Sequence, residues 1–250
     1  MEKTDFIKIN RSELSPMMEV VKYIDEGQSV PIVFGKDGLE LKTLNSSGSC
    51  VCEAKIRPKD FLAYNIAKPF SVSLDLNLLH RILKKMSGYE LAFGVKDGRF
   101  EISDSESRWQ IPIFAEDKES KCPNIDTLIF DVNFETDKKE LYEVLSSANI
   151  LSNEISLEVN GNAKFFTKNH NGDFEKTLKL KTDKKNKKTI SASFLIEHLK
   201  KLCERGSYGE IKVGLSKKAI LLAEPNLRIV IASITGEDGI VEEDYDDEEE

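Results

Sequence analysis

Hydrophobic and polar positions follow a pattern that recurs about four times along this chain. In each copy, apolar residues at helical spacing are followed by two short runs in which apolar and polar residues alternate, and a tight turn joins these two runs. The two most similar helical segments are residues 79–86 and 196–202, in which apolar positions alternate with basic ones. A recurring unit of this kind predicts a fold built from internal repeats.

The first half of the chain is predicted to contain two helices. One begins near residues 12–15, with Pro16 at an early helical position, and the other spans residues 76–86. Lys36-Asp37-Gly38 and Lys96-Asp97-Gly98 are hairpin turn signals. Strands are predicted at residues 30–34, 39–44, 50–56, 89–95, 99–103 and 109–114.

The second half repeats this arrangement after a polar stretch at residues 116–126. Helices are predicted at residues 138–148 and 194–203. The strands are expected at residues 128–134, 154–159, 163–167, 177–182, 211–215, 219–222 and 227–234. Because short turns connect neighbouring strands, those strands must be antiparallel, and the fold class is therefore α+β. Each half is expected to pack two helices on antiparallel sheets.

The charge of the chain is unevenly distributed. The formal net charge is −8, but residues 237–250 contain ten acidic residues and no lysine or arginine. The rest of the chain has 34 acidic and 36 basic residues, so it is slightly basic. The predicted organisation is an N-terminal domain at residues 1–115, a connector at 116–126, a C-terminal domain at 127–235 and a disordered acidic tail at 236–250.

Composition points to an ordinary intracellular globular protein. Hydrophobic residues make up 40% of the chain, and no run of eighteen apolar residues occurs. The first residues are charged and lack the apolar core of a signal peptide, so secretion is not expected. Four cysteines in a chain of this length do not form a typical disulfide framework. We expect a reducing compartment, either cytoplasm or nucleus.

Motifs for catalysis are lacking in the sequence. There is no glycine-rich phosphate loop before a helix, no nucleophile elbow and no paired-histidine metal motif. Cys50 and Cys52 share a strand face, but Cys122 and Cys203 lack ligand spacing. We therefore expect a protein that is not an enzyme and that binds no metal or cofactor. A nucleic-acid enzyme with an unrecognised carboxylate site remains an alternative.

Basic residues recur on the predicted helices. Arg81, Lys84 and Lys85 are spaced to share one side of a helix, and His198, Lys201 and Arg205 are spaced in the same way. A single basic helix is typically just solvated, but recurrence at equivalent places favours phosphate contact. Base-reading side chains do not cluster there, so the pattern indicates backbone contact without sequence recognition.

The chain resembles the DNA sliding clamp family, which comprises proliferating cell nuclear antigen and its archaeal and viral relatives. Residues 37–47 look like the family's hairpin and the serine turn that follows it, and residues 78–85 are similar to its second helix. The resemblance covers the body from Phe6 to Ile234, in register with the repeated units. It implies a ring, usually of three subunits with two similar domains each, in which helices line the hole.

The resemblance also implies roles for particular residues. The DNA-facing set would be Arg11, Lys22, Arg81, Lys84, Lys85, Lys138, Lys139, Lys200, Lys201 and Arg205. An apolar pocket for partner peptides, beneath the connector, would be formed by Leu44, Val51, Ile125, Val230, Ile231 and Ala232. Strand 108–114 would pair with strand 177–182 of the next subunit through Arg108, Trp109, Ile111, Ile113, Thr177, Leu178 and Leu180.

The implied function is that of a DNA polymerase processivity factor, which encircles duplex DNA and recruits replication and repair proteins. Its implied partners are double-stranded DNA of any sequence, a DNA polymerase, a clamp loader and other proteins with clamp-binding peptides. Either a homotrimer or a heterotrimer fits the sequence, and no membrane is implied. Two further alternatives stay open, a subunit of a hetero-oligomeric ring such as a DNA-damage checkpoint clamp and a plain interaction scaffold. We expect it at the site of DNA replication, in the cytoplasm or nucleoid, or in the nucleus.

Overall fold

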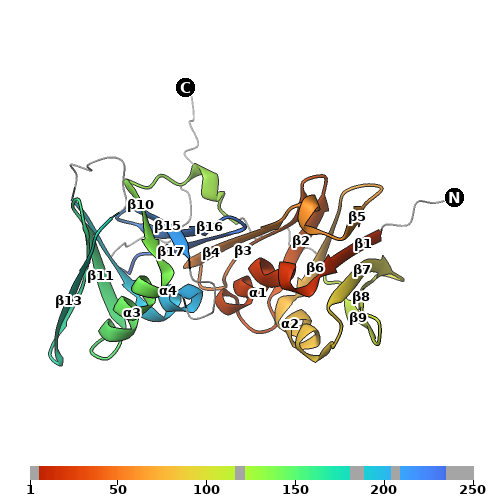
Figure 1. Ribbon diagram of the computed structural model, residues 1–250, viewed down its shortest axis with the longest axis horizontal. Helices are drawn as coiled ribbons and strands as arrows, with labels where there is room; N and C mark the ends of the chain where they lie inside the picture. Colours follow the sequence, from red (N-terminus) through yellow and green to blue (C-terminus); the bar gives the residue numbers. More distant parts are fainter. Residues whose placement is uncertain (1–5, 116–121, 181–188, 204–208, 235–250) are drawn as a thin grey trace, which may run out of the picture. The chain divides into compact units, whose positions relative to one another are not determined.

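A computed structural model describes residues 6–115, 122–180, 189–203 and 209–234 (Figure 1). The chain forms two compact units. The first comprises Met1–Ser46, Cys52–Cys122 and Ala223–Ile229, and the second comprises Ser47–Val51, Pro123–Leu222 and Val230–Glu250. Each unit contains helices and antiparallel strands, so the predicted α+β class with two similar domains is confirmed. Each unit also contains a short segment from the other half of the chain, Ala223–Ile229 in the first unit and Ser47–Val51 in the second. The sequence pattern did not predict these exchanged segments.

One sheet of the first unit consists of five strands paired side by side. Their order is β5 (Ala63–Asn65), β1 (Phe6–Asn10), β7 (Glu90–Lys96), β8 (Arg99–Ser103) and β9 (Arg108–Pro112). The strand β1 pairs with β7 in antiparallel register, with Asn10 opposite Glu90. Strand β9 is an edge of this sheet.

The first unit has a second row of strands. Their order is β4 (Cys50–Ile56), β3 (Gly38–Leu44), β2 (Ser29–Gly35) and β6 (Phe70–Asp75). The turn between β2 and β3 requires glycine, because Gly38 has a φ of +109° and a Cβ there would lie 2.0 Å from the Ile56 carbonyl oxygen. The Tyr64 hydroxyl contacts the carbonyl oxygens of Gly35 and Gly38 at 2.9 and 2.8 Å, and burial raises its pKa to about 12.

The helices of the first unit begin directly after β1 and β6. The predicted first helix is divided into η1 (Arg11–Leu14, 3₁₀), α1 (Ser15–Val20) and η2 (Val21–Tyr23, 3₁₀), whereas α2 (Leu76–Lys85) is continuous. The Asp75 carboxylate caps α2 by accepting a hydrogen bond from the Leu78 N–H at 2.9 Å. A third 3₁₀ turn, η3, spans Pro58–Asp60. The buried positions of α2 follow helical spacing and are Leu76, Leu79, Ile82 and Leu83.

The second unit also has two groups of strands. One group is ordered β13 (Gly172–Leu178), β12 (Ala163–Asn169), β11 (Glu154–Val159) and β14 (Ile190–Leu195). The other is ordered β10 (Val132–Asp137), β15 (Glu210–Leu215), β16 (Ala219–Glu224) and β17 (Leu227–Ala232). Helices α3 (Lys138–Ala148) and α4 (Ile196–Cys203) lie side by side (Figure 1). The Asp137 carboxylate caps α3 through the N–H groups of Lys139 and Glu140, at 2.8 and 3.2 Å.

At the start of the first helical segment, the two units have the same strand pairing and an equivalent main-chain hydrogen bond, in agreement with the sequence repeat. Asn10 pairs with Glu90 in the first unit as Asp137 pairs with Glu210 in the second. The next residue donates an equivalent main-chain bond in each unit, from Arg11 N–H to the Tyr89 carbonyl at 2.9 Å and from Lys138 N–H to the Gly209 carbonyl at 3.0 Å. Counting residues from these points matches Leu14 with Leu141, Ser15 with Tyr142, Leu79 with Leu199 and His80 with Lys200 in sequence order, although the first segment begins as a 3₁₀ helix and α3 is an α-helix.

Several predicted boundaries differ from the structure. Strand 128–134 is observed later, as β10 (Val132–Asp137), and the segment before it contains the 3₁₀ turn η4 (Ile125–Thr127). Strand 177–182 is instead β13, which ends at Leu178, and residues 181–182 lie outside the described residues. Four observed strands were not predicted: β1, β5, β6 and β14. Most of the connector (116–121) and the acidic tail (236–250) also lie outside the described residues, so their conformations stay predictions.

Candidate functional site

The most exposed group of basic side chains predicted for DNA lies on α2. Arg81, Lys84 and Lys85 are all exposed, on the side opposite the buried leucines of that helix. An Arg81 nitrogen lies 3.9 Å from the Glu26 carboxylate, and the two side chains are 64% and 83% exposed. Such a pair contributes little in water, so it leaves the guanidinium available to an anionic ligand.

The other two basic residues predicted in the first unit are held more closely by the protein. Arg11 is half-buried, and its Nη1 donates to the Met86 carbonyl oxygen at 2.8 Å. Lys22 forms an ion pair with Glu19 one turn earlier. Lys22 is therefore paired with a carboxylate, whereas the Arg11 guanidinium contacts a carbonyl oxygen, which carries no formal charge.

In the second unit, Lys139 is exposed and Lys200 and Lys201 are half-buried. The Lys200 ammonium lies 5.2 Å from the centroid of the Tyr142 ring, a cation–π contact between α4 and α3. Lys201 forms an ion pair with Glu197 at 3.2 Å. Arg205 lies outside the described residues. Tyr142 was not predicted as a site residue, because its role depends on a partner from another helix.

Lys138 was predicted to face DNA, but this residue is only 6% exposed. It begins α3 and lies three and seven residues before Leu141 and Leu145, which are buried at 3% and 0%. That spacing places Lys138 on the inward side of the helix, so its ammonium does not belong to the exposed basic face.

His198 was expected on the polar side of its helix, but it is half-buried. Its Nδ1 has no hydrogen-bond partner among the described residues. Burial lowers the pKa of His198, and the positive charge of Lys201 lowers it further, although Glu197 opposes both effects. The imidazole is therefore neutral at pH 7, and His198 adds no charge to this face.

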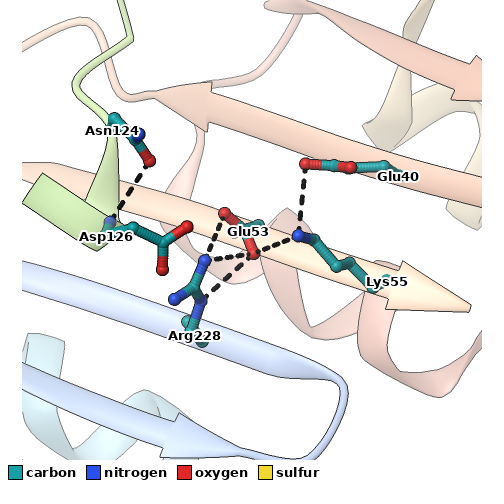
Figure 2. Close-up of polar contacts among 6 residues, drawn as sticks. All are labelled: Glu40, Glu53, Lys55, Asn124, Asp126 and Arg228. Atoms are coloured by element: carbon teal, nitrogen blue, oxygen red, sulfur yellow. Dashed lines mark hydrogen bonds and ion pairs between the residues drawn. The ribbon is translucent and has the colours of Figure 1, made fainter.

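A buried ion pair that the sequence did not reveal holds an exchanged segment in the first unit. Figure 2 shows Arg228 of β17 directed at Glu53 of β4, with nitrogen–oxygen distances of 2.7, 2.9 and 3.1 Å. The Glu53 side chain is 5% exposed. The Lys55 ammonium lies 3.2 Å from the Glu53 carboxylate and 3.5 Å from the Glu40 carboxylate. Because the partners are 175 residues apart, local sequence patterns do not predict the contact.

The residues predicted for a peptide pocket differ in exposure. In the second unit, Val51, Ile125, Val230 and Ile231 are at most 3% exposed, while Ala232 is half-buried. Ile125 lies in η4, whose first turn is capped by the Asn124 side chain accepting from the Asp126 N–H at 3.2 Å (Figure 2). Leu44 is half-buried in the first unit. The pocket stays a prediction.

The residues predicted for a subunit interface lie at or near two sheet edges. Strand β9 contains Arg108, Trp109 and Ile111, and β13 contains Thr177 and Leu178. Ile113 and Leu180 follow these strands, so the predicted strands are too long at those ends. Ile111 and Leu178 are buried at 1% and 5%, whereas Trp109 is 40% exposed. The edges and the exposed side chains can pair with another chain, but the interface stays a prediction.

Neither a metal site nor a membrane-spanning helix is found among the described residues. Within the described part of the chain, no group of three or more histidine, cysteine or acidic residues is placed to hold a metal ion. The helices described here also include none with the length and apolar character needed to cross a membrane. The most distinctive chemistry on these residues is therefore the positive charge of the helices.

The chain matches no protein-family model and no curated protein sequence. Its structure is nevertheless similar to that of PCNA from A. fulgidus, solved with the C-terminal region of FEN-1 bound. That likeness has a TM-score of 0.81 and 14% sequence identity, over 94% of this chain and 100% of the other. PCNA from Thermococcus kodakaraensis gives a TM-score of 0.79 and 13% identity, over 92% and 100%. The chain therefore has the fold of the PCNA-like sliding clamps.

Proposed function

We propose that this chain is a subunit of a sliding clamp, a non-enzymatic ring that encircles duplex DNA at the site of replication. The observation that carries the proposal is the clamp fold, matched over 94% of the chain. The resemblance of the sequence to the same family supports it independently. As a ring, the protein would tether a DNA polymerase and other DNA-processing proteins to their template.

In this proposal, the basic helices hold the ring on DNA without reading its sequence. Arg81, Lys84 and Lys85 present charge without a neighbouring cluster of base-reading side chains. Contacts between such residues and phosphates are individually weak and are exchanged readily along the duplex. The ring would therefore stay centred on the DNA and remain able to slide.

Ring closure would use the edge strands β9 and β13. An edge strand has unpaired N–H and C=O groups, and pairing it with a strand of the next subunit satisfies them. Recruitment would use short peptides of the partner proteins. The A. fulgidus clamp was solved with a region of FEN-1 bound, which supports the same mode of recruitment here.

The test compares two triple variants that lose the same charge. The first is Arg81→Gln, Lys84→Gln and Lys85→Gln on α2, and the control is Lys36→Gln, Lys59→Gln and Lys96→Gln at exposed sites elsewhere in the first unit. For duplex binding, the slope of log K against log salt concentration is about 0.9 per phosphate contact. Losing three contacts should therefore reduce the magnitude of this slope by about 2.7. The control variant should stay close to the parent. Fluorescence anisotropy over a salt series measures both.

A topological assay completes the test. With a clamp loader present, the protein should remain on nicked circular DNA and should be lost when that DNA is cut once. Equal effects of the two triple variants, or equal retention on circular and linear DNA, would contradict the proposal. The mass of the protein in solution separates a homotrimer from a subunit that needs different partner chains.

A further inference from the structure

A hollow of about 470 Å³ opens in the first unit between the start of the first helical segment and α2. Its lining includes three basic residues, Arg11, His80 and Lys84, and no acidic residue of the described chain. Ser12, Ser15 and Tyr89 add hydroxyl groups. A concave surface with this excess of positive charge concentrates anions.

The rim of the hollow is held in place by hydrogen bonds between segments that are distant in sequence. Arg11 donates from its main-chain N–H to the Tyr89 carbonyl at 2.9 Å and from Nη1 to the Met86 carbonyl at 2.8 Å. The hydroxyls of Ser12 and Tyr89 lie 3.3 Å apart. A guanidinium has five N–H groups, so the bond to Met86 leaves others for a ligand. The site is therefore formed before any ligand arrives, which lowers the entropy cost of binding.

The equivalent position in the second unit has a larger side chain. By the residue count, Tyr142 corresponds to Ser15 and Lys200 corresponds to His80. The Lys200 ammonium of α4 lies 5.2 Å from the centroid of the half-buried Tyr142 ring of α3, so the two side chains contact each other across the helix pair. In addition, Lys138, which corresponds to Arg11, is buried. The hollow thus depends on a small residue at position 15 and a surface arginine at position 11.

We propose that this hollow binds a phosphate group, and that its source is the backbone of duplex DNA. Arg11 and His80 would donate N–H groups to the phosphate oxygens, Ser12 would donate its hydroxyl, and Lys84 would supply charge. The inference rests on the proposed function and adds to it a discrete binding point. It makes the first unit the one that holds the DNA backbone at a preformed site, while the second offers only surface charge.

The first experiment uses inorganic phosphate as the probe and the full-length protein. Imidazole ¹H–¹⁵N NMR should show a saturable shift of the His80 signals, beyond that caused by sodium chloride at equal ionic strength. His198, in the second unit, is the internal control and should not respond. Ser15→Tyr copies the second unit and should abolish the His80 response while keeping every charge. Lys96→Gln, which removes an exposed charge outside the hollow, should leave it unchanged.

The second experiment measures duplex DNA binding by the same proteins. Ser15→Tyr should weaken binding several-fold and lower the salt slope by about 1, the effect of one lost phosphate contact. Arg11→Gln should do the same, and it tests the site independently if the tyrosine disturbs folding. Circular dichroism confirms that each variant is folded.

The outcomes separate this inference from the proposed function. The lack of a saturable His80 shift would overturn the phosphate site, even if the parent binds DNA. A His80 shift with unchanged DNA affinity in Ser15→Tyr would identify free phosphate as the source and overturn the DNA contact. If phosphate shifts His80 but the parent does not bind DNA, the proposed function fails and the phosphate site stands alone.

Discussion

The helix pairs of the two units begin directly after equivalent strands but present different surfaces. In the first unit, Ser15 and His80 line a hollow, whereas in the second unit the Tyr142 ring contacts the Lys200 ammonium at 5.2 Å. Arg11 lies at the rim of the hollow, whereas its counterpart Lys138 is 6% exposed. Equivalent positions in a repeat therefore need not have equivalent roles, because side-chain size and direction decide whether a charge meets solvent.

The exchanged segments show a second difference between the units. Segment Ala223–Ile229 is held in the first unit by a main-chain bond from the Lys55 N–H to the Asn226 carbonyl at 3.0 Å and, in addition, by the ion pair of Arg228 with Glu53. Segment Ser47–Val51 is fastened in the second unit through the main chain, by the Ala232 N–H donating to the Ser49 carbonyl at 2.8 Å. A buried ion pair is strongly dependent on both partners, whereas a main-chain bond tolerates most side-chain changes.

The largest expected effect therefore comes from Arg228→Gln. Among the described residues, the substitution leaves the buried Glu53 carboxylate with the ion pair to Lys55 at 3.2 Å in place of the lost guanidinium. A fully buried pair would lose more, but Arg228 is 26% exposed, so we expect a free energy of unfolding lower by about 2–3 kcal/mol. Urea unfolding measures it. Arg99→Gln, which removes an exposed arginine, should stay within about 0.5 kcal/mol of the parent, and equal losses would show that the pair has no special role.

The next effect tests the buried lysine against its exposed neighbour. Lys138→Glu places a carboxylate on the inward side of α3, and we expect a loss of about 2 kcal/mol or more in unfolding free energy. Lys139→Glu should be neutral or slightly stabilising, because an acidic side chain at a helix N-terminus favours the helix dipole. Thermal unfolding of the two variants measures the difference. If Lys139→Glu were the more damaging substitution, the assignment of the inward side would be wrong.

The smallest effect concerns the cation–π contact between Tyr142 and Lys200 in the second unit. A double-mutant cycle with Tyr142→Leu and Lys200→Gln should give a coupling energy of about 0.5–1 kcal/mol, as expected for a partly exposed cation–π contact. The same cycle at Ser15→Leu and His80→Gln should give no coupling, because Ser15 offers no ring. Coupling of equal size in both units would remove this distinction between them.

Much of the local structure could be predicted from the chain alone. Helix α3 and the strands β4, β8 and β11 were predicted with the bounds observed, and the recurrence of basic helices was visible before any contact was known. These features depend on periodicity and turn residues, which act over a few neighbouring positions. Lys138 shows the limit of such reasoning, because a lysine at the start of a helix gives no local sign of which side it will occupy.

The sequence by itself determined the α+β class, the repeat and the positive charge of the helices, because these depend on composition and spacing along one segment. Only the tertiary structure decided which of those charges stay exposed, which segments the units exchange and where a hollow remains. Each of these depends on residues far apart in the chain, such as Glu53 with Arg228 or Ser15 with His80. Packing between such partners follows from the fold as a whole, since no local pattern encodes the space that two distant side chains leave between them.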